Sequence, residues 1–264
     1  MHTQTIDLYG CRIAFRVSQG SGTCLLFLHG AGSAGAVWQA QGDFFQTLAP
    51  VIIPDLPGHG DSPGRGRTSI DAYAGIVTEL MAALGKGPFV VIGHSMGGAI
   101  AQTIALAHPE MIMGLVLMGT GARLRVTGQI FTAIEADYDQ YLDLASSFSV
   151  PATAGQPIVS RLRELFSKTE KAVVSGDFRA CDDFDIMDRV ASIRTRTLII
   201  NGDSDMMTPL KYAQYLHEQI PGSRLHVMAG TGHMAMIERP EEVNAAIKEF
   251  LFTCFRTRCD TYYG

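Results

Sequence analysis

The strongest chemical signal in the sequence is a G-x-S-x-G pattern, Gly93-His94-Ser95-Met96-Gly97. The pattern directly follows the apolar run Phe89–Ile92 and opens a helical stretch, which is the context in which a serine stands on a sharp strand-to-helix turn. Side chains two residues before and after the serine would collide in such a turn, so both positions are glycine. We therefore predict that Ser95 is a nucleophile at the positive end of a helix.

A second glycine-rich turn is a source of hydrogen-bond donors. The segment His29-Gly30-Ala31-Gly32 follows the apolar run Cys24–Leu28. A turn of this kind can aim a backbone N–H at a point in front of a nucleophile. An oxyanion hole needs such donors, and the residue after the serine supplies one of them. We expect the N–H groups of Ala31 and Met96 to form the oxyanion hole.

A serine nucleophile needs a general base, and the sequence holds 8 histidines. When the nucleophilic serine stands on a strand-to-helix turn of this kind, the acid and then the base follow it along the chain. His233 fits this order, because it lies in a loop between an expected strand and the last expected helix, where catalytic groups collect. The others lie at the N-terminus, before the serine, ahead of a proline at a helix end, or within a helix or strand: His2, His29, His59, His94, His108, His217 and His226. We expect His233 to be the base.

The acid that orients this base should follow a strand between Ser95 and His233. The apolar run Thr197–Asn201 is such a strand, and Gly202-Asp203-Ser204-Asp205 follows it. Either aspartate could accept the imidazole proton, and either could instead cap the turn. The residues alone leave both aspartates open. No third ligand accompanies them, so we expect no metal site.

These groups stand at the ends of short apolar runs that alternate with helical stretches. Continuous apolar runs suit strands that are buried on both faces, and their alternation with helices suits a parallel sheet covered by helices. The expected strands are Cys24–Leu28, Val51–Ile53, Phe89–Gly93, Gly114–Met118, Thr197–Asn201 and Arg224–Met228. The expected helices are Ala36–Leu48, Ile70–Leu84, Met96–Ala107, Leu210–Gln219 and Pro240–Phe252.

The N-terminal segment predicts an antiparallel edge to this sheet. Ile6–Leu8 and Arg12–Val17 flank a turn at Tyr9-Gly10, which is typical of a hairpin. The sequence therefore predicts the α/β class: a mostly parallel sheet of about eight strands with helices on both faces.

One interval, Ala122–Ile193, breaks the alternation of strand and helix. It contains no strand-like run, and its helical periodicity covers Ile130–Leu144 and Ile158–Ser175. We interpret it as a helical insertion between two strands of the sheet. The core would then comprise residues 1–121 and 194–264, and the insertion residues 122–193.

Composition and charge exclude several classes of protein. The net charge of −5 argues against a nucleic-acid binder, which would carry a basic patch. The apolar runs are far shorter than the ~20 residues of a membrane-spanning helix, and the N-terminus lacks the pattern of a signal peptide. The 5 cysteines include no C-x-x-C, which favours free thiols in a reducing compartment. We expect a cytoplasmic protein that binds neither nucleic acid nor membrane.

Together these motifs resemble the α/β-hydrolase fold family, and the match covers most of the chain. The sequence is similar to a capped group that includes carboxylesterases, lactonases, ring-cleavage C–C hydrolases and cofactor-free haloperoxidases. The segments that carry the resemblance are His29–Gly32, Asp55–Ser62, Gly93–Gly98, Gly202–Pro209 and Gly232-His233.

The resemblance implies roles for several residues. In this family the acid follows the strand-ending glycine by three residues and precedes a proline by four, and Asp205 fits this spacing to Gly202 and Pro209, whereas Asp203 does not. The segment Asp55–Ser62 has a structural role in the family, and the helical insertion corresponds to a cap over the active site. Serine in place of aspartate at position 95 argues against epoxide hydrolase and haloalkane dehalogenase activity.

We therefore expect a serine hydrolase that cleaves carboxylic esters through an acyl-enzyme, with Ser95, Asp205 and His233 as its triad and without a metal or organic cofactor. Three alternatives stay open: a C–C bond hydrolase or lactonase of aromatic ring-cleavage pathways, a cofactor-free haloperoxidase or perhydrolase, and a slow-turnover ligand receptor. The fold does not decide among them. The expected partner is a small-molecule ester or related carbonyl compound, and the oligomeric state is left open.

The expected substrate is an uncharged acyl compound of small to medium size. Methionines flank the motifs, and we expect Met118 and Met234 to line an apolar pocket, although each could instead be ordinary core. Arg123 and Arg125 are the only basic residues near the motifs, and they could face solvent or bind an anionic group.

Overall fold

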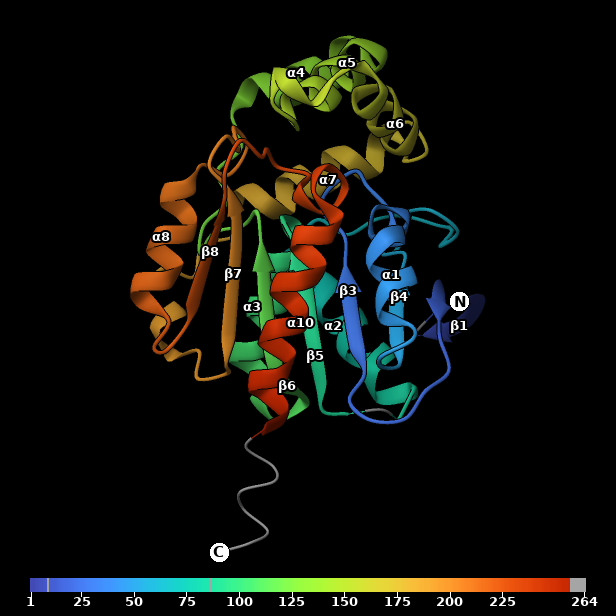
Figure 1. The fold of residues 1–264 in the computed structure, drawn as a ribbon. Helices are drawn as coiled ribbons and strands as arrows, with labels where there is room; N and C mark the ends of the chain where they lie inside the picture. Colours follow the sequence, from blue (N-terminus) through green and yellow to red (C-terminus); the bar gives the residue numbers. More distant parts are fainter. Residues whose placement is uncertain (9, 86, 257–264) are drawn as a thin grey trace, which may run out of the picture.

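An eight-stranded sheet runs through the centre of the protein (Figure 1). The computed structural model describes residues 1–8, 10–85 and 87–256, so Tyr9 and Cys259 lie outside the described residues. The strand order is β1-β2-β4-β3-β5-β6-β7-β8. The strands are β1 (His2–Leu8), β2 (Cys11–Val17), β3 (Leu25–Leu28), β4 (Val51–Pro54), β5 (Phe89–His94), β6 (Ile112–Met118), β7 (Thr197–Gly202) and β8 (Arg224–Met228).

The predicted hairpin forms the antiparallel edge of this sheet. β1 pairs with β2 so that Leu8 lies opposite Cys11, and β2 pairs antiparallel with β4. The other neighbouring strands are all parallel. The prediction of a mostly parallel α/β sheet is confirmed, and its parallel strands bring their carboxyl ends to one edge, where ligands bind in such sheets.

The continuous apolar runs form strands that are buried on both faces. Every residue of β3, β4, β5 and β7 is buried. Alternate residues divide between two cores, as the period of a strand requires: in β3, Leu26 and Leu28 face one core, and Leu25 and Phe27 face the other. The edge strand β8 is only partly buried.

Helices cover both faces of the sheet, as Figure 1 shows. One face packs on α2 (Ile70–Ala83), α3 (Met96–Ala107) and α8 (Leu210–Gln219), and the other on α1 (Gln39–Phe45), α9 (Ala235–Glu238) and α10 (Pro240–Arg256). The bounds of α3 and α8 are those predicted. The predicted helix Ala36–Leu48 is divided into a 3-10 turn, Gly35–Trp38, and α1, and the short α9 was not predicted.

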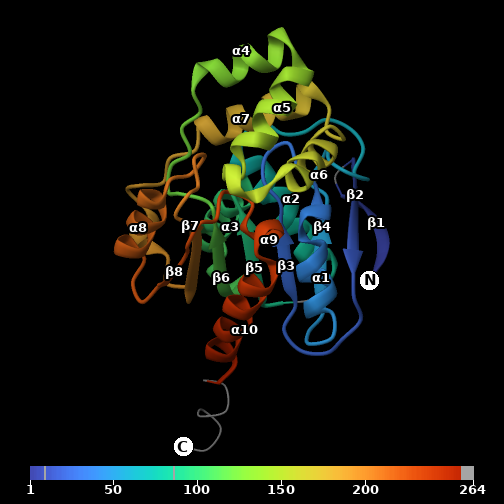
Figure 2. The same cartoon turned by 45° about the horizontal axis from the view of Figure 1, so that its top comes forward.

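The segment between β6 and β7 is a helical insertion. It contains α4 (Gly128–Ala136), α5 (Tyr138–Phe148), α6 (Gln156–Phe166) and α7 (Lys171–Asp182). Figures 1 and 2 show α4, α5 and α6 beyond one end of the sheet, with α7 between them and the strands. The limits of this insertion as a separate unit, residues 122–193, stay a prediction.

The two stretches of helical periodicity in the insertion each form a pair of short helices. Asp137 interrupts the first in an extended conformation, and its side chain accepts a hydrogen bond from the N–H of Gln140 at 3.0 Å. It thereby caps α5, as aspartate does at many helix N-termini. The second is broken between α6 and α7. The apolar periodicity continues across both breaks, so the sequence pattern does not mark where one helix ends and the next begins.

Candidate active site

Ser95 stands on a strained turn between β5 and α3. Its φ of 53° and ψ of −117° make it the one non-glycine residue with positive φ in the described part of the chain. A side chain at Gly93 would collide with the carbonyl of Gly97, and one at Gly97 with the carbonyl of Leu28. These two close approaches are the reason for glycine on both sides of the serine. Strain of this kind is concentrated at functional sites.

His233 and Asp205 meet in the loops that follow β8 and β7. His233 Nδ1 lies 2.8 Å from Asp205 Oδ2. The N–H groups of Met207 and Thr208 each donate to Asp205 Oδ1 at 2.8 Å, and the Thr208 hydroxyl donates to Oδ2 at 2.7 Å. Because the carboxylate only accepts, Nδ1 of His233 is the donor, and in the neutral ring the free lone pair is on Nε2.

The environment of Asp205 keeps it ionised. Burial by itself raises the pKa of Asp205, but the charge of His233 and its hydrogen bond, together with the donors of Thr208, lower that pKa more, so it lies below its ordinary value. Asp203 has a different role: its exposed side chain accepts from the N–H of Gly230 at 2.8 Å. Of the two candidate acids, the structure brings Asp205 to His233 and leaves Asp203 at a turn.

Three further groups hold the backbone around His233. The carbonyl of Ser149, which follows α5 of the insertion, accepts from the N–H of His233 at 2.8 Å. Glu238 of α9 accepts from the N–H of Gly232 at 2.9 Å. His94 Nε2 lies 3.0 Å from the carbonyl of His233, and burial lowers the pKa of His94, so its neutral ring donates there. His233 is therefore positioned from the core and from the insertion.

The two expected oxyanion donors belong to segments next to Ser95. A Cβ added to Gly30 would lie 3.1 Å from Ser95 Cβ, so the turn after β3 runs directly beside the serine. Met96 is the first residue of α3, and the first N–H groups of a helix have no partner within it. The N–H of Ala31 has no acceptor among the residues that the structure describes. Both donors are available to a ligand.

A small cavity of about 50 Å³ opens beside these groups. Ala31, Ser95, His233 and Met234 line it from the core. The insertion contributes a largely aromatic and aliphatic wall: Tyr138, Tyr141, Leu142, Ala145, Ser149, Phe166, Val174 and Phe178. This wall was not predicted from the sequence. Its signal was present in α5, where residues 138, 141, 142 and 145 follow the spacing of one helix face.

Met118 does not line the cavity, which corrects the expectation for this residue. It ends β6 with its side chain fully buried in the core on the α10 side. Its carbonyl accepts from the N–H of Ser95 at 2.9 Å, so its backbone, not its side chain, supports the turn. Met234 does line the cavity.

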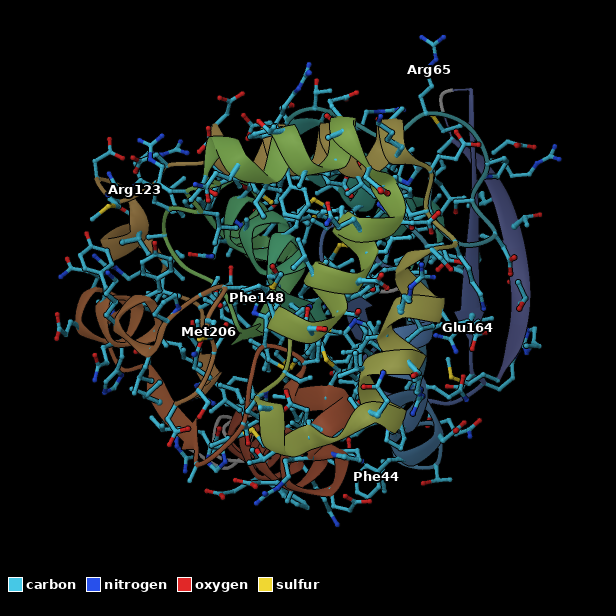
Figure 3. All side chains as sticks on the ribbon, turned by 90° about the horizontal axis from the view of Figure 1, so that it is seen from above. Phe44, Arg65, Arg123, Phe148, Glu164 and Met206 are labelled. Atoms are coloured by element: carbon cyan, nitrogen blue, oxygen red, sulfur yellow. The ribbon has the colours of Figure 1, made fainter. Side chains whose placement is uncertain are left out.

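The two arginines at the start of the insertion lie away from the cavity. The side chains of Arg123 and Arg125 are 44% and 58% exposed and lie 3.6 and 3.9 Å from the carboxylate of Asp185. Figure 3 shows Arg123 at the periphery of the molecule. Exposed ion pairs of this kind contribute little to stability. Neither arginine is placed to bind the acyl group of a substrate in the cavity.

The described part of the chain lacks two other kinds of feature. No group of three or more His, Cys, Asp or Glu side chains there is arranged to hold a metal ion. No described helix is long and apolar enough to cross a membrane.

Comparison with known proteins places this geometry in a family. A structure described as a thermophilic esterase is 33% identical, with a TM-score of 0.85, over 96% of this chain and 98% of the other. An N-acyl homoserine lactone degrading enzyme is 29% identical, with a TM-score of 0.86, over 94% of this chain and 100% of the other. The 2-hydroxymuconate semialdehyde hydrolase of Pseudomonas putida is 29% identical over 251 residues, 88% of each chain.

The family model described as "Alpha/beta hydrolase family" matches residues 25–246, which include the turn after β3, the Ser95 turn, and the loops of Asp205 and His233. The match covers most of the chain, and the eight-stranded sheet with its helical insertion agrees with it. The protein belongs to the alpha/beta hydrolase family.

Proposed function

We propose that the protein is a serine hydrolase that cleaves carboxylic esters of small to medium, uncharged acyl groups. The observation that carries the proposal is the convergence of strand ends on one cavity. Ser95 on its strained turn and His233 both line this cavity, and His233 Nδ1 lies 2.8 Å from the buried, ionised Asp205.

The chemistry follows from this arrangement. His233 Nε2 takes the proton of the Ser95 hydroxyl while the oxygen attacks the ester carbonyl, and Asp205 stabilises the imidazolium. The N–H groups of Ala31 and Met96 hold the oxyanion of the tetrahedral intermediate. His233 then protonates the leaving alcohol, which departs and leaves an acyl-enzyme. A water molecule activated by His233 releases the acid and restores Ser95.

The lining of the cavity supports an uncharged acyl group. It contains no Lys, Arg, Asp or Glu side chain, and its insertion wall is mainly aromatic and aliphatic. The volume of about 50 Å³ is far below the roughly 300–1,000 Å³ of pockets for drug-sized ligands. A short acyl chain fits this space better than a long one. In this proposal the insertion, residues 122–193, acts as a cap that selects the substrate.

A lactone is the second candidate substrate, because it is an internal ester that the same groups would open. The similarity to an N-acyl homoserine lactone degrading enzyme over 94% of this chain favours including it. The apolar residues Phe148 and Met206 are 53% and 68% exposed, and both are labelled in the view of Figure 3. Their neighbours Ser149 and Met207 line the cavity, with Ser149 Oγ 3.7 Å from Met207 Sδ. Phe148 and Met206 therefore offer apolar surface just outside the cavity to the aliphatic tail of such a lactone.

The test is a set of initial rates with p-nitrophenyl esters from acetate to decanoate, with lactones and an aryl diketone alongside. We expect a maximum between acetate and hexanoate for the wild type. Ser95→Ala should lose on the order of a millionfold in rate and keep its fold. An alanine variant with wild-type rates would overturn the proposal, and turnover of the diketone alone would replace it with C–C bond hydrolysis.

A further inference from the structure

A buried carboxylate of the insertion binds to three groups of the core. Asp177 lies on α7, and its side chain is fully buried. Its Oδ2 accepts from the N–H of Gly32 at 2.8 Å and lies 2.7 Å from His59 Nε2. Its Oδ1 accepts from the Tyr73 hydroxyl at 2.5 Å. Gly32 belongs to the turn after β3, which is the turn that carries the proposed oxyanion donor.

The charge of Asp177 is balanced within this buried cluster. Both ring nitrogens of His59 face acceptors: Nε2 faces Asp177, and Nδ1 lies 3.1 Å from the carbonyl of Pro57. A histidine ring can donate to both acceptors only when it carries two protons. Burial by itself lowers the pKa of His59, but the charge of Asp177 and its hydrogen bond, together with hydrogen bonds to the backbone of Pro57 and Leu56, raise that pKa more. Buried charges persist when they are paired and hydrogen-bonded in this way.

The peptide groups on the two sides of Ala31 are held separately. The carbonyl of Gly30 lies 2.9 Å from His29 Nδ1, and His29 Nε2 accepts from the N–H of Leu56 at 3.0 Å, so Nδ1 is the donor to Gly30. In a trans peptide the N–H points opposite to the carbonyl, so the Ala31 N–H points away from His29. The next peptide is held by Asp177 through the Gly32 N–H. The core therefore fixes one of the two peptides, and the insertion fixes the other.

We propose that Asp177 is a positioning residue that keeps the Ala31 N–H directed at the oxyanion, so that the seated insertion completes the oxyanion hole. This inference rests on the proposed function. Asp177 touches no substrate atom; it acts through the backbone of the Gly30–Gly32 turn. Gly32 has a φ of 61°, a conformation that glycine adopts without strain. Because glycine also adopts many other conformations, the turn needs an external partner to keep its shape. When α7 is displaced, the Gly32 N–H loses its acceptor and the donor at Ala31 loses its direction.

The test compares Asp177→Ala, which removes the acceptor, with Asp177→Asn, which retains an amide oxygen for the Gly32 N–H. With p-nitrophenyl acetate, Asp177→Ala should lower kcat on the order of 100-fold, the loss expected for one oxyanion donor, and change KM little. Asp177→Asn should recover most of the lost kcat. A trifluoromethyl ketone, which forms a tetrahedral adduct on a catalytic serine, should lose affinity for Asp177→Ala by the factor lost in kcat/KM.

Tyr73→Phe is the matched control, because it removes a hydrogen bond to the other oxygen of the same carboxylate and leaves the Gly32 contact intact. It should reduce the melting temperature and leave kcat near that of the wild type. If Asp177→Ala does not fold, Asp177→Ser replaces it, since the shorter side chain ends before the Gly32 N–H and keeps a polar group in the cluster.

The outcomes separate this inference from the proposed function. A wild type with Ser95-dependent turnover, combined with a folded Asp177→Ala or Asp177→Ser variant of unchanged kcat, overturns the inference alone. An Asp177→Asn variant as slow as Asp177→Ala also overturns it, because the charge rather than the acceptor would then matter. A wild type whose ester hydrolysis does not depend on Ser95 overturns both.

Discussion

Replacement of Asp205 by asparagine should trap His233 in the wrong tautomer. The amide must orient its oxygen toward the N–H groups of Met207 and Thr208, which both donate to Oδ1 at 2.8 Å. The opposite orientation would set an NH₂ group against two N–H donors. The NH₂ group therefore occupies the Oδ2 position, 2.8 Å from His233 Nδ1. It donates to Nδ1, so the imidazole proton moves to Nε2 and the base can no longer accept the serine proton.

The size of this effect follows from the loss of the base. A histidine held in the wrong tautomer costs a triad enzyme roughly 10⁴-fold in kcat, which corresponds to about 5.5 kcal/mol of transition-state stabilisation. The overall geometry should be retained, because the two backbone hydrogen bonds to the side chain survive. The assay is kcat for p-nitrophenyl acetate hydrolysis, with circular dichroism and a melting curve to establish that the variant is folded.

Asp203→Asn is the control for this prediction. The side chain of Asp203 is exposed, and its amide oxygen can still accept from the N–H of Gly230, so its kcat should stay within roughly threefold of the wild type. A loss in Asp203→Asn that exceeds the loss in Asp205→Asn would refute the assignment of the acid. Near-normal rates in both variants would mean that no carboxylate of this loop orients the base.

The remaining predictions concern substrate choice, charge and the Ser95 turn. Arg123→Ala and Arg125→Ala should leave the chain-length profile unchanged; a preference for an anionic substrate that disappears in either variant would contradict this. Burial lowers the pKa of His59, but Asp177 and two backbone hydrogen bonds raise it more. The stability that His59 contributes is therefore complete below about pH 6.5 and is lost as pH rises through its folded-state pKa. In urea titrations, the stability advantage of wild type over His59→Gln should therefore narrow at alkaline pH, and a constant advantage would contradict the charged pair. Gly93→Ala should cost about 4 kcal/mol or more, because its Cβ meets backbone; a melting curve like that of the wild type would refute the steric argument.

The elements of the core could be predicted because their signals are local. The strands are continuous apolar runs, and α3 and α8 begin and end at the residues that their periodicity indicates. The insertion was less predictable, because the cap at Asp137 divides a periodic stretch without interrupting its apolar pattern. Apolar periodicity indicates which face of a helix is buried, but it does not indicate where one helix ends and the next begins in a new direction.

In the candidate site, too, some residues carry a local sequence signal and others are brought together only by packing. Ser95, His233 and the two candidate acids follow strand ends, which the sequence marks. The resemblance to a known family favoured Asp205 over Asp203, and the structure brings Asp205 within 2.8 Å of His233. The cavity wall and Asp177 could not be found in this way. Asp177 lies 118 residues along the chain from His59, and only the packing of α7 on the core brings the two together. Met118 was expected in the pocket because the sequence does not say on which face of the sheet a strand-end side chain lies.

The most direct test of the account is the covalent intermediate itself. The wild type would be treated with a fluorophosphonate, and with p-nitrophenyl acetate under rapid acid quenching, and the modified peptide would be located by mass spectrometry. The account predicts a single phosphonyl or acetyl group on Ser95, absent in Ser95→Ala. Modification of another residue, or hydrolysis at the wild-type rate with no adduct on Ser95, would contradict the claim that this serine is the nucleophile.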